Sequence, residues 1–148
     1  MRRRELLAAG SICGASSVLC VVGAVWGGEP AYRVIVHPAN ALRTVPSDWL
    51  ADAFLKKTTR WPEGEIVRPV DQRAASEVRK AFSHGVLRRS VGAVRSYWQQ
   101  RIFSGRDVPP PEVDSDEAVV TFVSKYPGAV GYVGFAVKLA GVRELVIK

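Results

Sequence analysis

Few side chains in this 148-residue sequence are of the types that perform nucleophilic, acid–base or metal chemistry. The two cysteines, Cys13 and Cys20, both lie in the first 20 residues, so the rest of the chain can form neither a disulfide scaffold nor a cysteine-ligated zinc site. His37 and His84 are the only imidazoles, which argues against a histidine-rich metal site. His84 also follows Ser76 by eight residues, too far around a helix for a Ser–His pair.

The acidic residues do not suggest a catalytic pair either. Asp114, Asp116 and Glu117 stand at the predicted start of a helix, where the helix dipole favours negative charge. We therefore expect a protein that is not an enzyme, with no catalytic residues, no metal site and no cofactor.

The charge balance is basic, which favours anionic partners. Lysine and arginine number 21 against 14 acidic residues, for a net charge of +7. Small oxyanions, phospholipid headgroups and nucleic acids are all compatible with this excess. The densest basic loop contains Lys56, Lys57 and Arg60, and it is a candidate docking patch for membrane headgroups or a partner.

Residues 1–31 read as an export signal or a membrane anchor. Arg2, Arg3 and Arg4 form a basic start, and the chain from Leu6 to Gly28 carries no charge. The two arginines before Glu5 fit the twin-arginine route as well as the general secretory route. The uncharged run is also long enough to span a bilayer as an uncleaved anchor. We expect a periplasmic protein, exported and either released or anchored to the inner membrane.

One stretch of the sequence mixes aromatic and basic residues as nucleic-acid-binding surfaces do, although an exported protein seldom meets nucleic acid. Tyr97, Trp98 and Phe103 lie among Arg95 and Arg101, a mixture that is also found on nucleic-acid-binding surfaces. Their helical spacing instead predicts core and rim positions, so no nucleic-acid partner is expected.

Residues 32–148 alternate between strand and helix patterns. Hydrophobic residues make up 47% of the chain, and no low-complexity tract or repeat is present, which indicates one globular domain. Strands are predicted at 34–36, 65–70, 130–133 and 145–147, and helices at 47–54, 76–87, 90–102 and from 115 to before Pro127. Serines at 47, 76, 90 and 115 are suited to begin these helices. This order predicts an α/β fold, with helices packed on a mixed sheet.

Four segments carry a family resemblance, in order along the chain. They read VIVHPAN at 34–40, FLKKTTRW at 54–61, VRPVD then SEVRKAF within 67–82, and YPGAVGYV at 126–133. Together they resemble the phosphate ABC-transporter substrate-binding proteins, which have a strand with an N-P-x-N-like end, a helix closing on I-F-x-G-K-x-T-x-W, an S-G-T-R-x-x-F helix start and a P-G-A-I-G-Y-V signature. The resemblance covers 33–133 and corresponds to a single lobe of a type 2 periplasmic binding protein-like fold, where a full binding protein closes two lobes on its anion.

The resemblance also implies an anion site at the start of one helix. Free backbone N–H groups and the helix dipole favour a negative ligand there. Ser76 sits where the family places its serine, Gln72 stands where an arginine is expected, and Arg73 follows it. Arg73 or Arg79 would grip phosphate through two hydrogen bonds. The alternative is an ordinary N-cap for Ser76 and solvated surface charges for the two arginines.

Two substitutions in the family pattern oppose tight phosphate binding. Glu77 replaces the glycine after the serine, and Val78 replaces the following threonine, so a carboxylate is added and a hydroxyl donor is lost. The sequence therefore leaves two functions open. One is an exported binder of phosphate or a related small oxyanion, associated with an ABC-type phosphate transporter. The other is a ligand-free interaction module that keeps the fold and docks on a membrane or protein partner.

Overall fold

The computed structural model describes residues 31–148. The predicted export segment, 1–31, therefore lies outside the described residues except for its last position. Within the described part, no helix is both long and apolar enough to cross a membrane.

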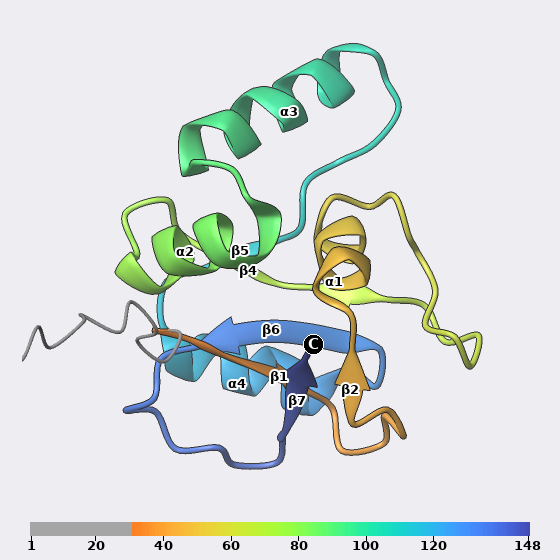
Figure 1. Cartoon of the computed structure of the whole chain (residues 1–148), viewed down its shortest axis with the longest axis vertical. Helices are drawn as coiled ribbons and strands as arrows, with labels where there is room; N and C mark the ends of the chain where they lie inside the picture. Colours follow the sequence, from red (N-terminus) through yellow and green to blue (C-terminus); the bar gives the residue numbers. More distant parts are fainter. Residues whose placement is uncertain (1–30) are drawn as a thin grey trace, which may run out of the picture.

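A five-stranded mixed sheet forms the centre of the fold (Figure 1). Its order is β2 (Thr44–Val45), β7 (Arg143–Ile147), β1 (Arg33–Val36), β6 (Ala129–Val133) and β3 (Arg68–Pro69). β1 lies antiparallel to β6 and to β7, whereas the two edge strands run parallel to their neighbours. The predicted α/β class with a mixed sheet is confirmed.

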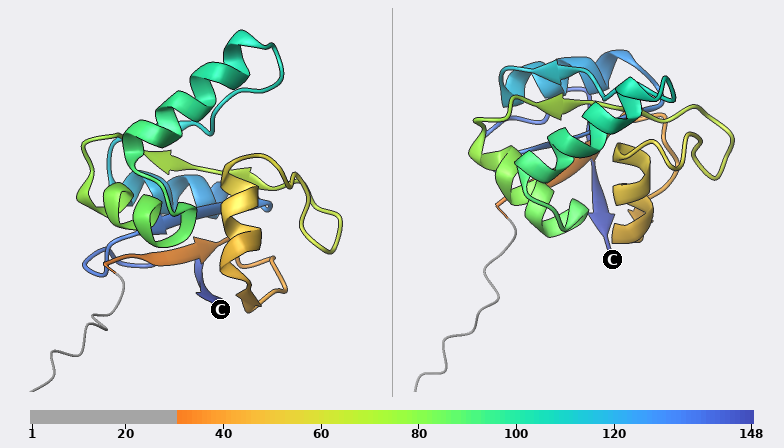
Figure 2. Two further views of the ribbon diagram at one scale, coloured as in Figure 1. Left: turned by 45° about the horizontal axis from the view of Figure 1, so that its top comes forward. Right: turned by 90° about the horizontal axis from the view of Figure 1, so that it is seen from above.

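Helices cover both faces of this sheet. On one face lie α1 (Ser47–Phe54), α2 (Glu77–Phe82) and the π-helix η1 (Ser83–Leu87), and on the other lies α4 (Asp116–Lys125), as Figures 1 and 2 show. The side chains of β1 alternate between the two hydrophobic cores: Val34 and Val36 belong to the α1 side, and the residue between them to the α4 side.

Aromatic side chains fill the core beneath α2. Phe82 stacks on Tyr132 with ring centroids 3.9 Å apart and planes 7° from parallel, and Phe54 packs against both rings. All three side chains are almost fully buried. Helices and sheet are therefore joined by residues from three of the four segments that carry the family resemblance.

A second, two-stranded parallel sheet lies beside the main one. It pairs β4 (Asp71–Gln72) with β5 (Glu112–Val113). Between these strands the chain forms α2, η1 and then α3 (Val91–Phe103), which extends away from the body of the molecule (Figures 1 and 2). The sequence did not predict β2, β4 or β5, because each is two residues long and exists only through its distant partner.

Three predicted elements differ in detail. Only Arg68–Pro69 of the predicted strand 65–70 joins the sheet, because Ile66 pairs back with Arg60 in a local turn. The predicted helix 76–87 is α-helical only to Phe82 and continues as η1. Ser47 is the first residue of α1 and not its cap: Pro46 occupies the cap position, without a side-chain hydrogen bond.

Candidate anion site

Ser76 caps α2, as the sequence predicts. Its Oγ accepts a hydrogen bond from the backbone N–H of Arg79 (3.2 Å) and donates one to Oε1 of Gln72 (2.7 Å). The first bond satisfies one of the free donors at the start of a helix. The second bond uses the only proton of the Ser76 hydroxyl, so this hydroxyl has no further hydrogen to donate to a ligand.

Gln72 is buried, with an exposed fraction of 3%. Its Nε2 donates to Oδ1 of Asp116 (2.8 Å) and to the carbonyl oxygen of Tyr132 (2.9 Å), while its Oε1 accepts from Ser76. The amide thus links the start of α2 to α4 and β6. Both amide hydrogens and the amide oxygen are engaged within the protein.

Arg79 is also buried, with an exposed fraction of 6%. Its guanidinium lies 3.4 Å from Oδ2 of Asp71 and 2.6 Å from Oε1 of Glu112, and it donates to the carbonyl oxygen of Gln72. The sequence suggested either a phosphate grip or a solvated surface charge for this residue. The solvated-surface interpretation is wrong, because the side chain turns inward and pairs with Asp71 of β4 and Glu112 of β5. The phosphate grip stays a prediction.

Burial controls the protonation of this network. Desolvation raises the pKa of Asp71, although the charge of Arg79 and the hydrogen bond from the Tyr132 hydroxyl oppose the rise. Desolvation and the Asp71 carboxylate together raise the pKa of Tyr132, which stays a neutral donor. Burial alone would lower the pKa of Arg79, but the neighbouring carboxylates raise it, so the guanidinium keeps its charge.

What remains open to an anion is the first turn of α2 and Arg73. The backbone N–H groups of Glu77 and Val78 have no hydrogen-bond partner among residues 31–148. The Arg73 side chain is exposed and, within the same residues, makes no ion pair. Opposing charge comes from the exposed carboxylate of Glu77, which lies 2.7 Å from Nζ of Lys80. The structure therefore separates Arg73 from the other three predicted residues, which are joined in one internal network.

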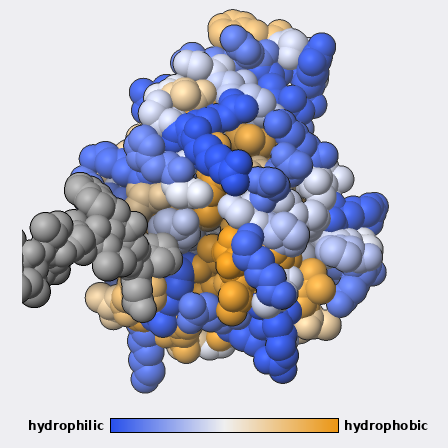
Figure 3. Space-filling view, viewed as in Figure 1, coloured by the Kyte–Doolittle hydropathy of each residue, from blue (hydrophilic) through white to orange (hydrophobic). Residues whose placement is uncertain are grey.

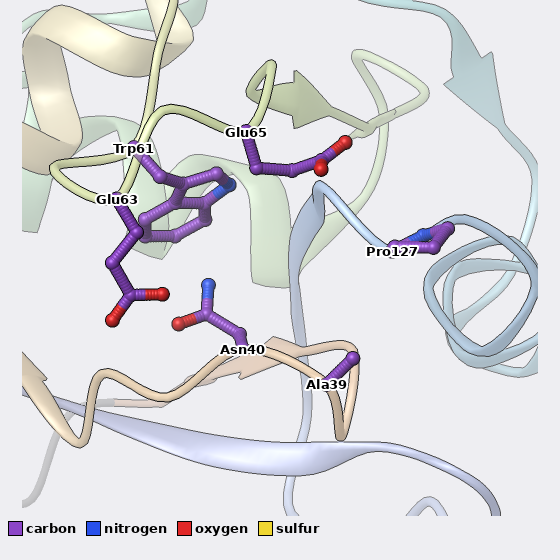
Figure 4. A pocket seen from close by; sticks show the side chains of 6 residues that line it. All are labelled: Ala39, Asn40, Trp61, Glu63, Glu65 and Pro127. Atoms are coloured by element: carbon purple, nitrogen blue, oxygen red, sulfur yellow. The ribbon is translucent and has the colours of Figure 1, made fainter.

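A pocket elsewhere on the molecule does not suit an anion. It has a volume of about 230 Å³ and is lined by Ala39, Asn40, Trp61, Glu63, Glu65 and Pro127 (Figure 4). The side chains of Glu63 and Glu65 border the space, and their carboxylates would repel an oxyanion. None of the sequence-predicted site residues lines this pocket.

The predicted basic docking loop is partly engaged within the protein. Arg60 donates to the carbonyl oxygen of Gly64 (2.8 Å), and Lys57 lies 3.9 Å from the carboxylate of Asp52.

For metals, the described residues contain no group of three or more His, Cys, Asp or Glu side chains placed to hold an ion.

Comparison with known proteins connects this arrangement to a fold. No protein-family model and no curated protein matches the chain. Solved structures do match. A structure described as a phosphate ABC transporter substrate-binding protein from Clostridium perfringens, with bound phosphate, gives a TM-score of 0.62 at 20% identity. An ABC-type phosphate transport receptor from Vibrio cholerae gives 0.56 at 16%, and PstS from Borrelia burgdorferi gives 0.55 at 13%.

This chain has the fold of one lobe of those proteins. The matches cover 79–80% of this chain but only 44–47% of the three solved chains. The resemblance predicted from the four sequence segments is confirmed at the level of the fold. The neighbours are transporter substrate-binding proteins.

Proposed function

We propose that this protein is an exported, substrate-binding-like protein that binds phosphate or a related small oxyanion at the start of α2. Its fold supports the proposal, because it is that of one lobe of phosphate-binding proteins, one of which was solved with phosphate bound. Ser76 caps α2 within this fold. By the same analogy we propose that the protein works in the periplasm beside an ABC-type phosphate transporter.

The chemistry of such binding would be that of a helix N-terminus. The free N–H groups of Glu77 and Val78 would donate to the anion, and the exposed guanidinium of Arg73 would add positive charge. The Ser76 hydroxyl would join them only by turning away from Gln72. Glu77 would weaken binding by placing a carboxylate beside the ligand.

A second candidate function follows from the closed network around Gln72. Ser76, Gln72 and Arg79 already satisfy one another and their buried neighbours, so the start of α2 is stable without a ligand. This arrangement favours an interaction module that keeps the fold, binds no anion and docks on a membrane or protein partner.

Calorimetric titration with phosphate and sulfate at low salt separates the two functions. If the site binds anions, Glu77→Gly should tighten phosphate binding about tenfold, which corresponds to about 1.4 kcal/mol. Ser76→Ala should weaken binding, because one donor is lost. Glu63→Gly is the matched control: it removes an exposed carboxylate from a pocket that contains none of the predicted site residues, and it should leave the affinity within about twofold.

The alternative function makes the opposite prediction for the same proteins. Heat signals indistinguishable from buffer for wild type, Glu77→Gly and Ser76→Ala would show that this lobe does not take the ligand. Equal tightening by Glu77→Gly and Glu63→Gly would mean that the anion responds to net charge and not to the start of α2.

A further inference from the structure

The segment 88–108, called here the α3 arm, projects from the body of the molecule (Figures 1 and 2). Within α3 only Val94 and Trp98 are buried. At its far end three large apolar side chains, called here the arm tip, face solvent: Ile102 is 51% exposed, Phe103 92% and Val108 62%. Figure 3 shows mostly hydrophilic residues around α3 and a small, pale-orange apolar area at the upper edge of the molecule, near the far end of α3.

The turn that carries the arm tip is closed by specific contacts. The backbone N–H of Arg106 donates to the carbonyl oxygen of Arg101 (3.1 Å), and the Arg101 guanidinium lies 3.4 Å from the carboxylate of Asp107. These bonds join the backbone on the two sides of the turn, so Ile102, Phe103 and Val108 all lie near the far end of the arm.

The arm is strongly basic. Residues 88–108 contain five arginines, at 88, 89, 95, 101 and 106, and one acidic residue, Asp107. That carboxylate is already paired with Arg101. Arg95 and Arg106 are exposed and form no ion pair within residues 31–148. Arg88 lies 3.3 Å from the carboxylate of Asp48 in α1, so the exposed positive charge that accompanies the apolar tip is that of Arg95 and Arg106.

We propose that the arm tip inserts into the surface of an anionic phospholipid bilayer. Apolar side chains at the end of a projecting arm can bury themselves at the boundary between the lipid headgroups and the acyl chains. The nearby arginines would then lie among the lipid phosphates. The charge excess selects an anionic surface over a neutral one. This inference deepens the interaction-module candidate by naming its partner, but it stands whether or not α2 binds phosphate.

Spin-label accessibility in the full chain tests the proposal. Nitroxide labels are placed by Phe103→Cys and, as a matched control, by Phe135→Cys, both with Cys13→Ser and Cys20→Ser. Phe135 is 52% exposed and lies outside the arm. On phosphatidylglycerol vesicles, the ratio of oxygen to nickel-chelate collisions at position 103 should exceed that at position 135 about tenfold, because interfacial apolar groups lie below the headgroups.

Two further double substitutions test which side chains place position 103 in the bilayer. Ile102→Ser with Val108→Ser, and separately Arg95→Gln with Arg106→Gln, should each lower the ratio at position 103 on phosphatidylglycerol. These side chains are exposed, so the fold should not change. Phosphatidylcholine vesicles should give little protection.

Equal ratios at positions 103 and 135 on phosphatidylglycerol would overturn the proposal, as would equal protection on phosphatidylcholine. Protection of position 103 without vesicles, rising with protein concentration, would mean that a second copy of the chain covers the tip. The phosphate titrations are independent of these readings, so either proposal can fail alone.

Discussion

Replacing Arg79 by methionine would show whether the buried ion pair supports the fold or serves a ligand. Methionine keeps much of the length and apolar stem of arginine but removes the charge. In the variant, the Asp71 carboxylate of β4 stays buried against the Tyr132 hydroxyl without its cation. The Gln72 carbonyl also loses a donor.

The expected loss is large. Removing one partner of a buried ion pair typically costs about 3–5 kcal/mol, because the other charge is left uncompensated. The contact with Glu112 adds little to this figure, because that carboxylate is 52% exposed and water can replace the guanidinium. Arg73→Met is the matched control: the same change on an exposed side chain in the same region should stay within about 0.5 kcal/mol.

Urea unfolding at pH 7 and pH 5 measures the effect and its pH dependence. Arg79 lowers the pKa of Asp71, so the variant should raise that pKa further above its value in the unfolded chain. A raised pKa in the folded state gives stability that is present at low pH and lost as pH rises through that pKa. The deficit of Arg79→Met relative to wild type should therefore be smaller at pH 5 than at pH 7.

The result that refutes this reasoning is equally specific. If Arg79→Met and Arg73→Met lose the same stability at pH 7, the ion pair does not hold β4 and β5 together. If phosphate stabilises the wild type but not the folded Arg79→Met protein, the guanidinium serves a ligand after all. Adding Asp71→Asn to Arg79→Met should recover part of the loss, since it removes the unpaired charge.

Three other expectations can be checked directly. Phe82→Ala should destabilise the fold by about 3–5 kcal/mol in urea melts, because it empties the site stacked on Tyr132; a loss below about 1 kcal/mol would contradict the packing. Gly131→Ala should lower the free energy of unfolding by about 1–3 kcal/mol, because the new Cβ would lie 2.5 Å from a valine methyl group. Gly92→Ala is the control: nothing lies closer than 3.9 Å to its Cβ, so it should stabilise the protein slightly in the same urea melts. Residues 1–31 fused to a reporter should direct its export, and cytoplasmic retention of the fusion would overturn the localisation.

Local signals in the sequence predicted much of the fold. Serines at 76, 90 and 115 were expected to begin helices, and each accepts a hydrogen bond from a backbone N–H three residues later. A cap needs only a few consecutive residues, so its signal is visible in the chain itself. Apolar runs likewise placed Val34–Val36 and the 130–133 strand in the sheet.

The short strands and the end of α2 could not be read in this way. β2, β4 and β5 have two residues each, and no hydrophobic period can be recognised over two positions. The change from α2 to η1 at Ser83 also follows no local breaker. Ser83 is buried and donates to the carbonyl oxygen of Arg89, a contact that depends on how the chain continues after Leu87.

For the candidate site, the sequence by itself determined the position of Ser76, its role as a cap and the family resemblance around it. Only the tertiary structure decided what the neighbouring side chains do. Arg79 meets Glu112 from 33 residues away, and Gln72 meets Tyr132 from 60 residues away. Whether an arginine is a surface charge, an anion ligand or a buried partner depends on which distant carboxylates the sheet brings beside it. That information resides in strand pairing, and the residues next to Arg79 in the chain do not contain it.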